Sequence, residues 1–280
     1  MIKPLKKKST WWSIDGFELG QIKNDNDIGI LYKIPAQRYN DFVEYINPEL
    51  DNLDEILSNW NPLLSSYDTS ILFTDESNGS KYGIIPGESA ETKILPVSRK
   101  AQISISPQDP TALCHELAHI YDHCGTELKS ESQEFQNLIS DLKPKISQVY
   151  QLLRDAGYYS YETNDDIDAT HNHELKYTCD EELFAIISND WYCRTHEENS
   201  FANVKKPLIS EIVVDYLYTT NERFRNQVTE YCESIYPWLN PHLETVIERN
   251  FISETTWMKL DEVLELFTQE SEDPLYGQWF

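Results

Sequence analysis

Positive charge is scarce in this sequence. The 280 residues include 23 Lys and Arg against 48 Asp and Glu, which gives a formal net charge of −25. A chain this acidic repels phosphate backbones and anionic lipid surfaces, so we expect neither nucleic acid nor membrane insertion among its interactions. The same imbalance favours protein or peptide substrates that carry positive charge. We expect the protein itself to be a monomer.

Paired cysteines and long apolar runs are also missing. The cysteines are Cys114, Cys124, Cys179, Cys193 and Cys232. Their odd number, without a C-x-x-C motif, favours free thiols in a reducing compartment over a disulfide framework. No apolar run could span a bilayer, and the first ten residues lack the apolar stretch of a signal peptide. These features predict a soluble protein that is cytoplasmic or exported without a cleaved signal peptide.

Composition and length indicate a folded α+β protein. The chain is 40% hydrophobic and 12% aromatic, and it is long enough for one large domain or two small ones. Helical periodicity predicts a mostly helical region at 1–69, and a second helical region at 196–280. Between them, 70–195 combines short apolar runs typical of strands with further helical segments, which predicts a mixed α+β region. The three regions could also form one continuous domain.

Several short apolar runs read as strands. They are 29–34, 71–73, 82–85, 94–97 and 102–106, whereas the first 27 residues show no strong period. The last run alternates polar and apolar residues, as a half-exposed strand does, and it directly precedes the main motif. An exposed edge there could pair with an extended peptide, which makes Ile103, Ser104 and Ile105 candidate substrate-binding residues. The alternative is a plain edge strand that Pro107 blunts.

The motif with clear chemistry is His115-Glu116-Leu117-Ala118-His119, an H-E-x-x-H arrangement. Positions i and i+4 share one face of a helix, so His115 and His119 can hold one Zn²⁺ from the same side. Glu116 can then act as a general base on a water held by the metal. The alternative is a helix with two histidines at the edge of the core and a surface glutamate.

The sequence around the motif predicts the helix that it needs. Asp109 and Pro110 suit the N-cap and the first helical position. An apolar stripe at helical spacing should face the core; it consists of Leu113, Leu117, Ile120 and Cys124. Gly125 would end the helix as a left-handed C′ residue.

A catalytic zinc ion needs a third protein ligand. The sequence does not match the longer zinc-binding motif H-E-x-x-H-x-x-G-x-x-H, because Asp122 and Gly125 occupy the positions of its glycine and its third histidine. The candidates are His123, His171, His173 and Glu182. The first would lie too far along the helix axis, and the next two could reach the metal from a loop. The glutamate stands at the start of a predicted helix at 179–193, where a carboxylate could face the two histidines.

The motif and the later segment Glu182-Leu183-Phe184-Ala185 resemble the catalytic domain of anthrax lethal factor and related toxin endopeptidases. That family has H-E-x-G-H-x-x-D on one helix and E-x-F-A on a second. The resemblance covers 70–195 and implies a zincin-like catalytic core there, with a small mixed sheet of five or fewer strands packed on the active-site helix. It also implies Zn²⁺ held by His115, His119 and Glu182, and a toxin or effector that cleaves a protein inside a target cell. Ala118 replaces the family's glycine, and the gap between the two helices is longer here.

Further residues are candidates for supporting roles. The family's transition-state tyrosine precedes the ligand glutamate, and the matching offset here falls on Leu175, so Tyr177 and Tyr161 are both candidates. Asp122 could orient a ligand imidazole, or it could be a solvent-facing helix acid. An acid-rich loop should favour substrates with basic flanks, or it could be solvated and distant from the cleft. Its acids are Glu162, Asp165, Asp166 and Asp168.

Two other functional classes share the motif. Zinc-binding regulators of the ImmA/IrrE type carry H-E-x-x-H followed by a glutamate, but they usually work with helix-turn-helix partners, and this chain has no basic recognition helix. A non-catalytic zincin used as a binding module is the other alternative, and the intact Glu116 argues against it. The sequence therefore favours a zinc metalloendopeptidase.

Overall fold

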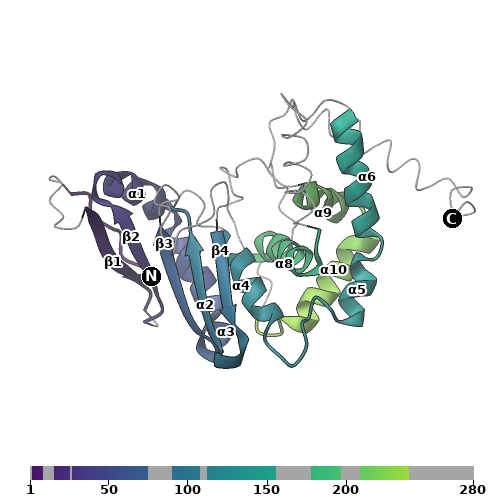
Figure 1. Ribbon diagram of the computed structural model, residues 1–280, viewed down its shortest axis with the longest axis horizontal. Helices are drawn as coiled ribbons and strands as arrows, with labels where there is room; N and C mark the ends of the chain where they lie inside the picture. Colours follow the sequence, from purple (N-terminus) through teal and green to yellow (C-terminus); the bar gives the residue numbers. More distant parts are fainter. Residues whose placement is uncertain are drawn as a thin grey trace, which may run out of the picture.

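The computed structural model describes residues 2–8, 16–25, 27–74, 90–107, 112–155, 178–196 and 209–239. It has the expected mixed α+β architecture, with a five-stranded sheet and a helical part that follows it in the chain. Figure 1 shows the sheet and the helices α1 to α3 at one end, a group of helices at the other end, and helix α4 between them.

The sheet is mixed, as the sequence predicted. Its strands are β1 (Phe17–Lys23), β2 (Gly29–Pro35), β3 (Asp68–Thr74), β4 (Ala90–Leu95) and β5 (Lys100–Ile105). They are arranged in the order β1-β2-β3-β5-β4. The three central strands are parallel, and the two outer strands, β1 and β4, are each antiparallel to their neighbour.

Helices fill the connections of the sheet and form the rest of the molecule. The first group is α1 (Tyr39–Ile46), α2 (Leu50–Asn59) and α3 (Asn61–Ser66), with short 3-10 turns at Ala36–Arg38 and Asn47–Glu49. The others are α4 (Ala112–Asp122), α5 (Gln133–Ile139), α6 (Leu142–Asp155), α8 (Asp180–His196), α9 (Ile209–Thr220) and α10 (Glu222–Ile235). None of the described helices is both long and apolar enough to cross a membrane.

One face of the sheet forms the core. Ile30 lies opposite Ile71, which lies opposite Ile103, and each of these side chains is at most 2% exposed. The ring of Phe42 on α1 contacts that of Phe73 on β3, with centroids 5.9 Å apart. The hydrophobic cluster that includes these residues extends from the start of the chain to Leu239 without a break between regions.

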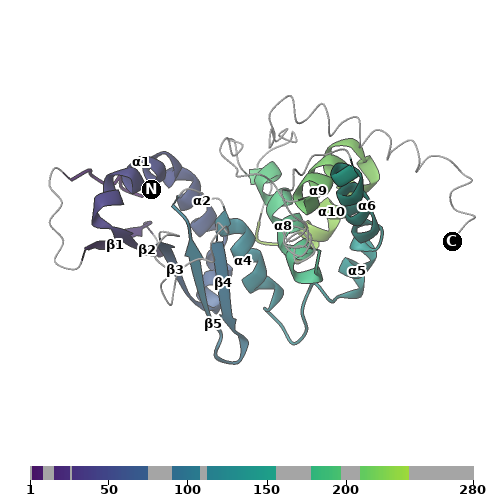
Figure 2. The same ribbon diagram turned by 45° about the horizontal axis from the view of Figure 1, so that its top comes forward.

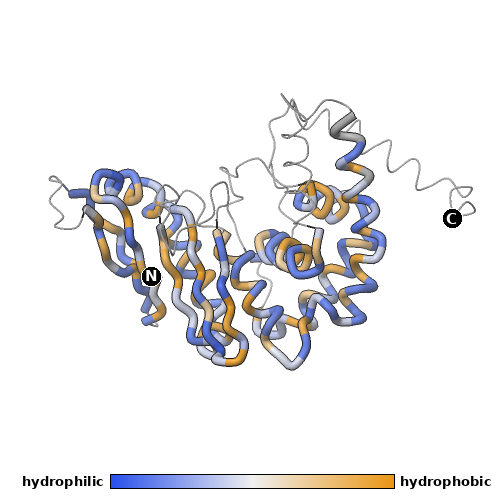
Figure 3. The backbone as a smooth tube through the Cα atoms, viewed as in Figure 1, coloured by the Kyte–Doolittle hydropathy of each residue, from blue (hydrophilic) through white to orange (hydrophobic). Residues whose placement is uncertain are grey.

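The helical part is arranged around two buried helices, α8 and α9. Figure 3 shows mostly hydrophobic residues in α9 and both hydrophobic and hydrophilic residues in α8, α5, α6 and α10. Figure 2 shows α8 beside α4, with α5 and α6 further out. The amphipathic helices thus cover the two buried helices, as burial of apolar surface requires.

The predicted boundary at residue 69 is wrong. Strands β1 and β2 belong to the sheet, and β3 crosses the boundary, so 1–69 is not a separate helical region. The shared core agrees with the alternative of one continuous domain. Strand β1 escaped prediction because Glu18 and Gly20 occupy two of its inward positions and break the apolar alternation. A Cβ at Gly20 would overlap the side chain of Tyr32 on β2, so the ring of Tyr32 fills the space that glycine leaves.

Strand β5 confirms the predicted run at 102–106 but not its place in the sheet. It pairs with β3 on one side and with β4 on the other, so it is not an edge strand. Ile103, Ser104 and Ile105 are 0%, 4% and 0% exposed, which excludes them as a surface for strand addition. The edge is β4, which ends at Leu95, where a 3-10 turn replaces the rest of the predicted strand 94–97. The run 82–85 lies outside the described residues.

Helices α5 and α6 are separated at 140–141, and Pro144 lies in the first turn of α6. Proline is tolerated there because the first N–H groups of a helix have no intrahelical partner. Helices α9 and α10 confirm part of the predicted helical region 196–280, whose remaining segments lie outside the described residues.

Candidate metal centre

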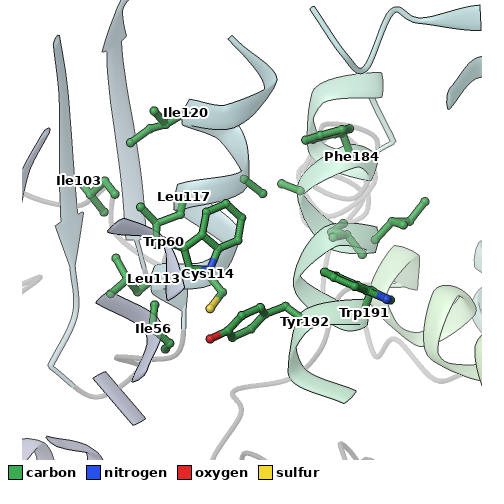
Figure 4. Packing of buried hydrophobic residues seen from close by; sticks show 14 of the residues in the cluster. Ile56, Trp60, Ile103, Leu113, Cys114, Leu117, Ile120, Phe184, Trp191 and Tyr192 are labelled. Carbon is green, nitrogen blue, oxygen red and sulfur yellow. The ribbon is translucent and has the colours of Figure 1, made fainter. Parts of the chain in front are cut away.

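Helix α4 is largely buried, and its two histidines, His115 and His119, lie at the edge of the buried face. Leu113, Leu117 and Ile120 are fully buried and, with Ile103, fill the space between α4 and the sheet (Figure 4). The helix packs against β4 and β5 on one side and against α8 on another. His115 and His119 lie off the apolar stripe, so burial of the helix leaves their rings beside Glu182 of α8.

The end of α4 differs from the prediction. The helix stops at Asp122, and Cys124 is half-buried rather than part of the core stripe. Gly125 does not adopt a left-handed conformation, and its N–H donates to the carbonyl of His123 at 3.1 Å. The predicted N-cap, Asp109 and Pro110, lies outside the described residues.

Helix α8 supplies the third candidate ligand from its first turn. Asp180 is held by Lys143 and by the amide of Gln136, whose Nε2 donates to its Oδ2 at 3.0 Å. Acidic residues at this end of a helix also interact favourably with its dipole. The first turn of α8 is therefore fixed, and Glu182 lies against the two histidines of α4.

The three donor atoms form a nearly equilateral triangle. His115 Nε2 is 3.1 Å from His119 Nε2, and Glu182 Oε2 is 3.3 Å from the first and 3.5 Å from the second. Tetrahedral zinc with bonds of about 2.1 Å separates its ligands by about 3.4 Å. The triangle is therefore the size of one face of a zinc coordination tetrahedron. Within the described part of the chain, no other group of three His, Cys, Asp or Glu residues comes together in this way.

One atom of the triangle, the carboxylate oxygen of Glu182, lacks a hydrogen bond. Glu182 Oε2 is buried and makes no hydrogen bond of acceptable geometry, although both imidazoles are close. Burial of a carboxylate oxygen without a donor costs free energy, and a cation bound by all three residues would remove that cost. The side chains of the three residues remain 16–17% exposed, so a water or a substrate can reach the fourth position that a catalytic metal needs.

Charge at the site favours a cation. Burial lowers the pKa of His115, but Glu182 and Glu116 raise it by more, to about 9. Burial raises the pKa of Glu182, but His115 and His119 lower it by more, to well below its usual range. The charge of Glu211, in the first turn of α9, also raises the pKa of His115. Three carboxylates thus raise the pKa of the His115 imidazole, and their field attracts either a proton or a metal ion.

The remaining candidate ligands divide into two groups. His123 lies outside the triangle, and its Nε2 is 4.0 Å from Oε2 of Glu181, which agrees with the expectation that it is too far along the helix. His171 and His173 lie outside the described residues. So do both candidate tyrosines, Tyr161 and Tyr177. The same holds for the acidic loop residues Glu162, Asp165, Asp166 and Asp168.

The predicted role of Asp122 is wrong. Its Oδ1 accepts from the backbone N–H of Ser130 at 2.7 Å, and its Oδ2 accepts from the Ser130 hydroxyl at 2.8 Å. Asp122 is also fully buried, which excludes a solvent-facing acid, and both of its oxygens accept from Ser130 rather than from a ligand imidazole. It instead fixes the loop after α4, and no local pattern in the sequence announced that the loop folds back.

A buried ionic network at the other end of α8 was missed. Arg194 Nε donates to Asp190 Oδ2 at 2.8 Å, and its Nη2 pairs with Asp215 on α9. The side chains of all three residues are at most 6% exposed, and the guanidinium lies over the ring of Tyr218. A signal was present, because Asp215 interrupts the apolar run of α9 and Arg194 follows Asp190 by one helical turn.

Comparison with known proteins adds no relative. No protein family model matches this chain, and neither does any curated protein or solved structure. The candidate metal centre therefore follows from the residues of this chain alone.

All five cysteines are free thiols, three of them buried.

Proposed function

We propose that this protein is a zinc-dependent endopeptidase whose metal site is formed by His115, His119 and Glu182. The observation that carries the proposal is the triangle of donor atoms, with sides of 3.1, 3.3 and 3.5 Å and one buried oxygen without a hydrogen bond. Two imidazole nitrogens and one carboxylate oxygen are the donor set of several zinc peptidases. The resemblance to lethal factor adds a protein substrate and a role as a toxin or secreted effector.

The residues around the triangle divide the chemistry. When bound, zinc would polarise the scissile carbonyl and make a water easier to deprotonate. Glu116, next to His115 in the chain and 6% exposed, takes the proton of the attacking water and passes it to the leaving amine. A tyrosine near the ligand helix, Tyr177 or Tyr161, would stabilise the oxyanion.

The edge strand β4 is the surface for an extended substrate. It pairs with β5 alone in the described sheet, and α4 packs against it. An extended peptide that adds to the free edge of β4 would run past the helix that carries His115 and His119. The net charge of −25 favours basic residues in such a peptide.

The decisive experiment measures metal content and peptide cleavage in matched variants. His115→Ala and His119→Ala should each lose the metal, because removal of one of three protein ligands sharply reduces affinity. His123→Ala removes a histidine from the next turn of the same helix, outside the triangle, and should keep one metal per chain. Equal metal content in all three variants would exclude the site.

Glu116→Gln separates metal binding from hydrolysis. This variant should keep its metal and lose cleavage by about 10²-fold or more, because glutamine cannot accept the proton of the attacking water. Glu181→Gln makes the same change beside the third ligand, at a side chain that is 50% exposed, and should retain activity. A metal-loaded protein that cleaves no peptide in a broad library would instead favour a binding module or a regulator.

A further inference from the structure

Residues 2–8 are held on the surface of α1 through their backbone. Asn47 Oδ1 accepts from the N–H of Leu5 at 2.9 Å, and its Nδ2 donates to the carbonyl of the same residue at 3.0 Å. Asn40 makes the same pair of hydrogen bonds with Lys8, at 2.9 and 3.1 Å. Each side-chain amide therefore satisfies both backbone groups of one residue, as a neighbouring strand does in a sheet.

The spacing of the two asparagines matches an extended chain. Asn47 continues the helix of α1, since its N–H bonds to the carbonyl of Val43. Seven residues of helix rise about 10.5 Å, and three residues of extended polyproline-like chain span about 9.3 Å. Leu5 and Lys8, three residues apart, thus meet Asn47 and Asn40 in register, and the chain runs antiparallel to the helix.

The backbone contacts are independent of sequence, and the side chains add a preference. Ile2 is buried in the core cluster, and Leu5 packs partly against it. Lys7 pairs with Glu44 on α1. Lys8 pairs with Glu18 on β1 and lies over the ring of Tyr39, 5.0 Å from its centroid. The surface therefore fits an extended segment with two apolar residues three apart, followed by adjacent lysines.

We propose that this surface of α1, formed by Asn40, Glu44 and Asn47, is a binding surface for extended lysine-rich peptides, and that residues 2–8 occupy it in cis. The partner is a lysine-rich segment of another polypeptide that displaces the chain's own segment. The binding surface lies at the end of the molecule remote from α4 (Figures 1 and 2). Peptide binding here is therefore independent of whether the metal centre hydrolyses peptide bonds.

Peptide binding can be tested on the full chain with the cis segment weakened. The substitutions Leu5→Pro and Lys8→Pro remove the two N–H groups that donate to the asparagines and leave Asn40, Glu44 and Asn47 unchanged. The probe is a fluorescent peptide with the sequence of residues 2–8, followed by anisotropy. The double variant should bind the probe at least tenfold more tightly than the unaltered chain, in which the attached segment competes at high effective concentration.

Substitutions in the binding surface then identify the residues that contact the peptide. Asn40→Leu or Asn47→Leu, added to the double variant, should weaken binding at least tenfold. Asn52→Leu makes the same change on α2, where the amide bonds only to Glu49, and should have no effect. A probe with glutamates in place of its last two lysines should bind more weakly, and the difference should shrink as salt rises.

The unaltered chain provides a second measurement that does not depend on any variant. Excess unlabelled peptide should increase hydrogen exchange at the amides of Leu5 and Lys8, because it displaces the segment that the asparagines protect. The proposal is overturned if exchange at these amides is unchanged at saturating peptide. It is also overturned if a folded double variant fails to bind the probe, or binds equally well with Asn40 and Asn47 replaced.

Discussion

Replacement of Arg194 should strongly destabilise the fold without removing the metal site. Its guanidinium is fully buried and is shared by Asp190 and Asp215, which are themselves 6% and 3% exposed. Arg194→Met retains the length of the side chain but leaves two buried carboxylates without a cation. Loss of one partner from a buried ionic network costs about 3–5 kcal/mol of unfolding free energy. For a chain of this size each kcal/mol lowers Tm by about 2–4 °C, so the expected decrease is about 6–20 °C.

The assay is urea unfolding, followed by circular dichroism and by tryptophan fluorescence because Trp191 lies in α8. Arg223→Met is the matched control, since Arg223 is exposed on α10 and should change stability by no more than about 0.5 kcal/mol. Glu182 lies at the opposite end of α8, about 18 Å from Arg194 along the helix axis. Metal content in Arg194→Met should therefore be unchanged below its melting temperature.

Two results would refute this reasoning. A loss below about 1 kcal/mol would mean that the two carboxylates find other donors or water. A loss of metal together with a normal Tm would mean that Arg194 acts on the site rather than on the packing of α8 against α9. The triple replacement by Leu, Met and Leu at positions 190, 194 and 215 should recover stability, because no buried charge then remains unpaired.

Three further outcomes are expected. Ser130→Ala removes the hydroxyl that donates to the buried Asp122 and should cost about 1–3 kcal/mol in thermal unfolding, whereas the exposed Ser65→Ala should cost almost nothing. In the metal-free protein, the pKa of His115 is raised from 6.5 to about 9, so the folded state holds its proton more tightly and the stabilisation is complete below pH 6.5. This stabilisation, about 3 kcal/mol of unfolding free energy at most, should be lost as pH rises through 9. A Tm measured in EDTA that is the same or higher at pH 9.5 than below pH 6.5 would contradict this. Zinc at a hundredfold excess over its Kd should add about 2.7 kcal/mol of stability, measured as a Tm increase that EDTA reverses and that Glu182→Gln abolishes.

The two histidines could be predicted from sequence because their signals are local. The spacing in H-E-x-x-H and the apolar positions Leu113, Leu117 and Ile120 together specify which face of α4 is buried, and the structure agrees. Glu182 lies on a helix far along the chain, and from the sequence it was one of four candidates for the third ligand. Its distance from His115 and His119 is set by how α8 packs on α4, which is a tertiary property.

The strand before α4 shows why alternation alone could not tell an edge strand from an interior strand. Polar and apolar residues alternate in β5 because Ile103 and Ile105 face the helices while Gln102 and Ser104 face the other side of the sheet. Alternation therefore reports the two faces of a strand and says nothing about its two edges. The edges of β5 are covered because the chain turns back at Arg99, in a left-handed conformation, and β4 pairs with it from outside. Because of that turn, the outer strand at this side of the described sheet is β4, which also packs against α4, and not the strand next to the motif in sequence.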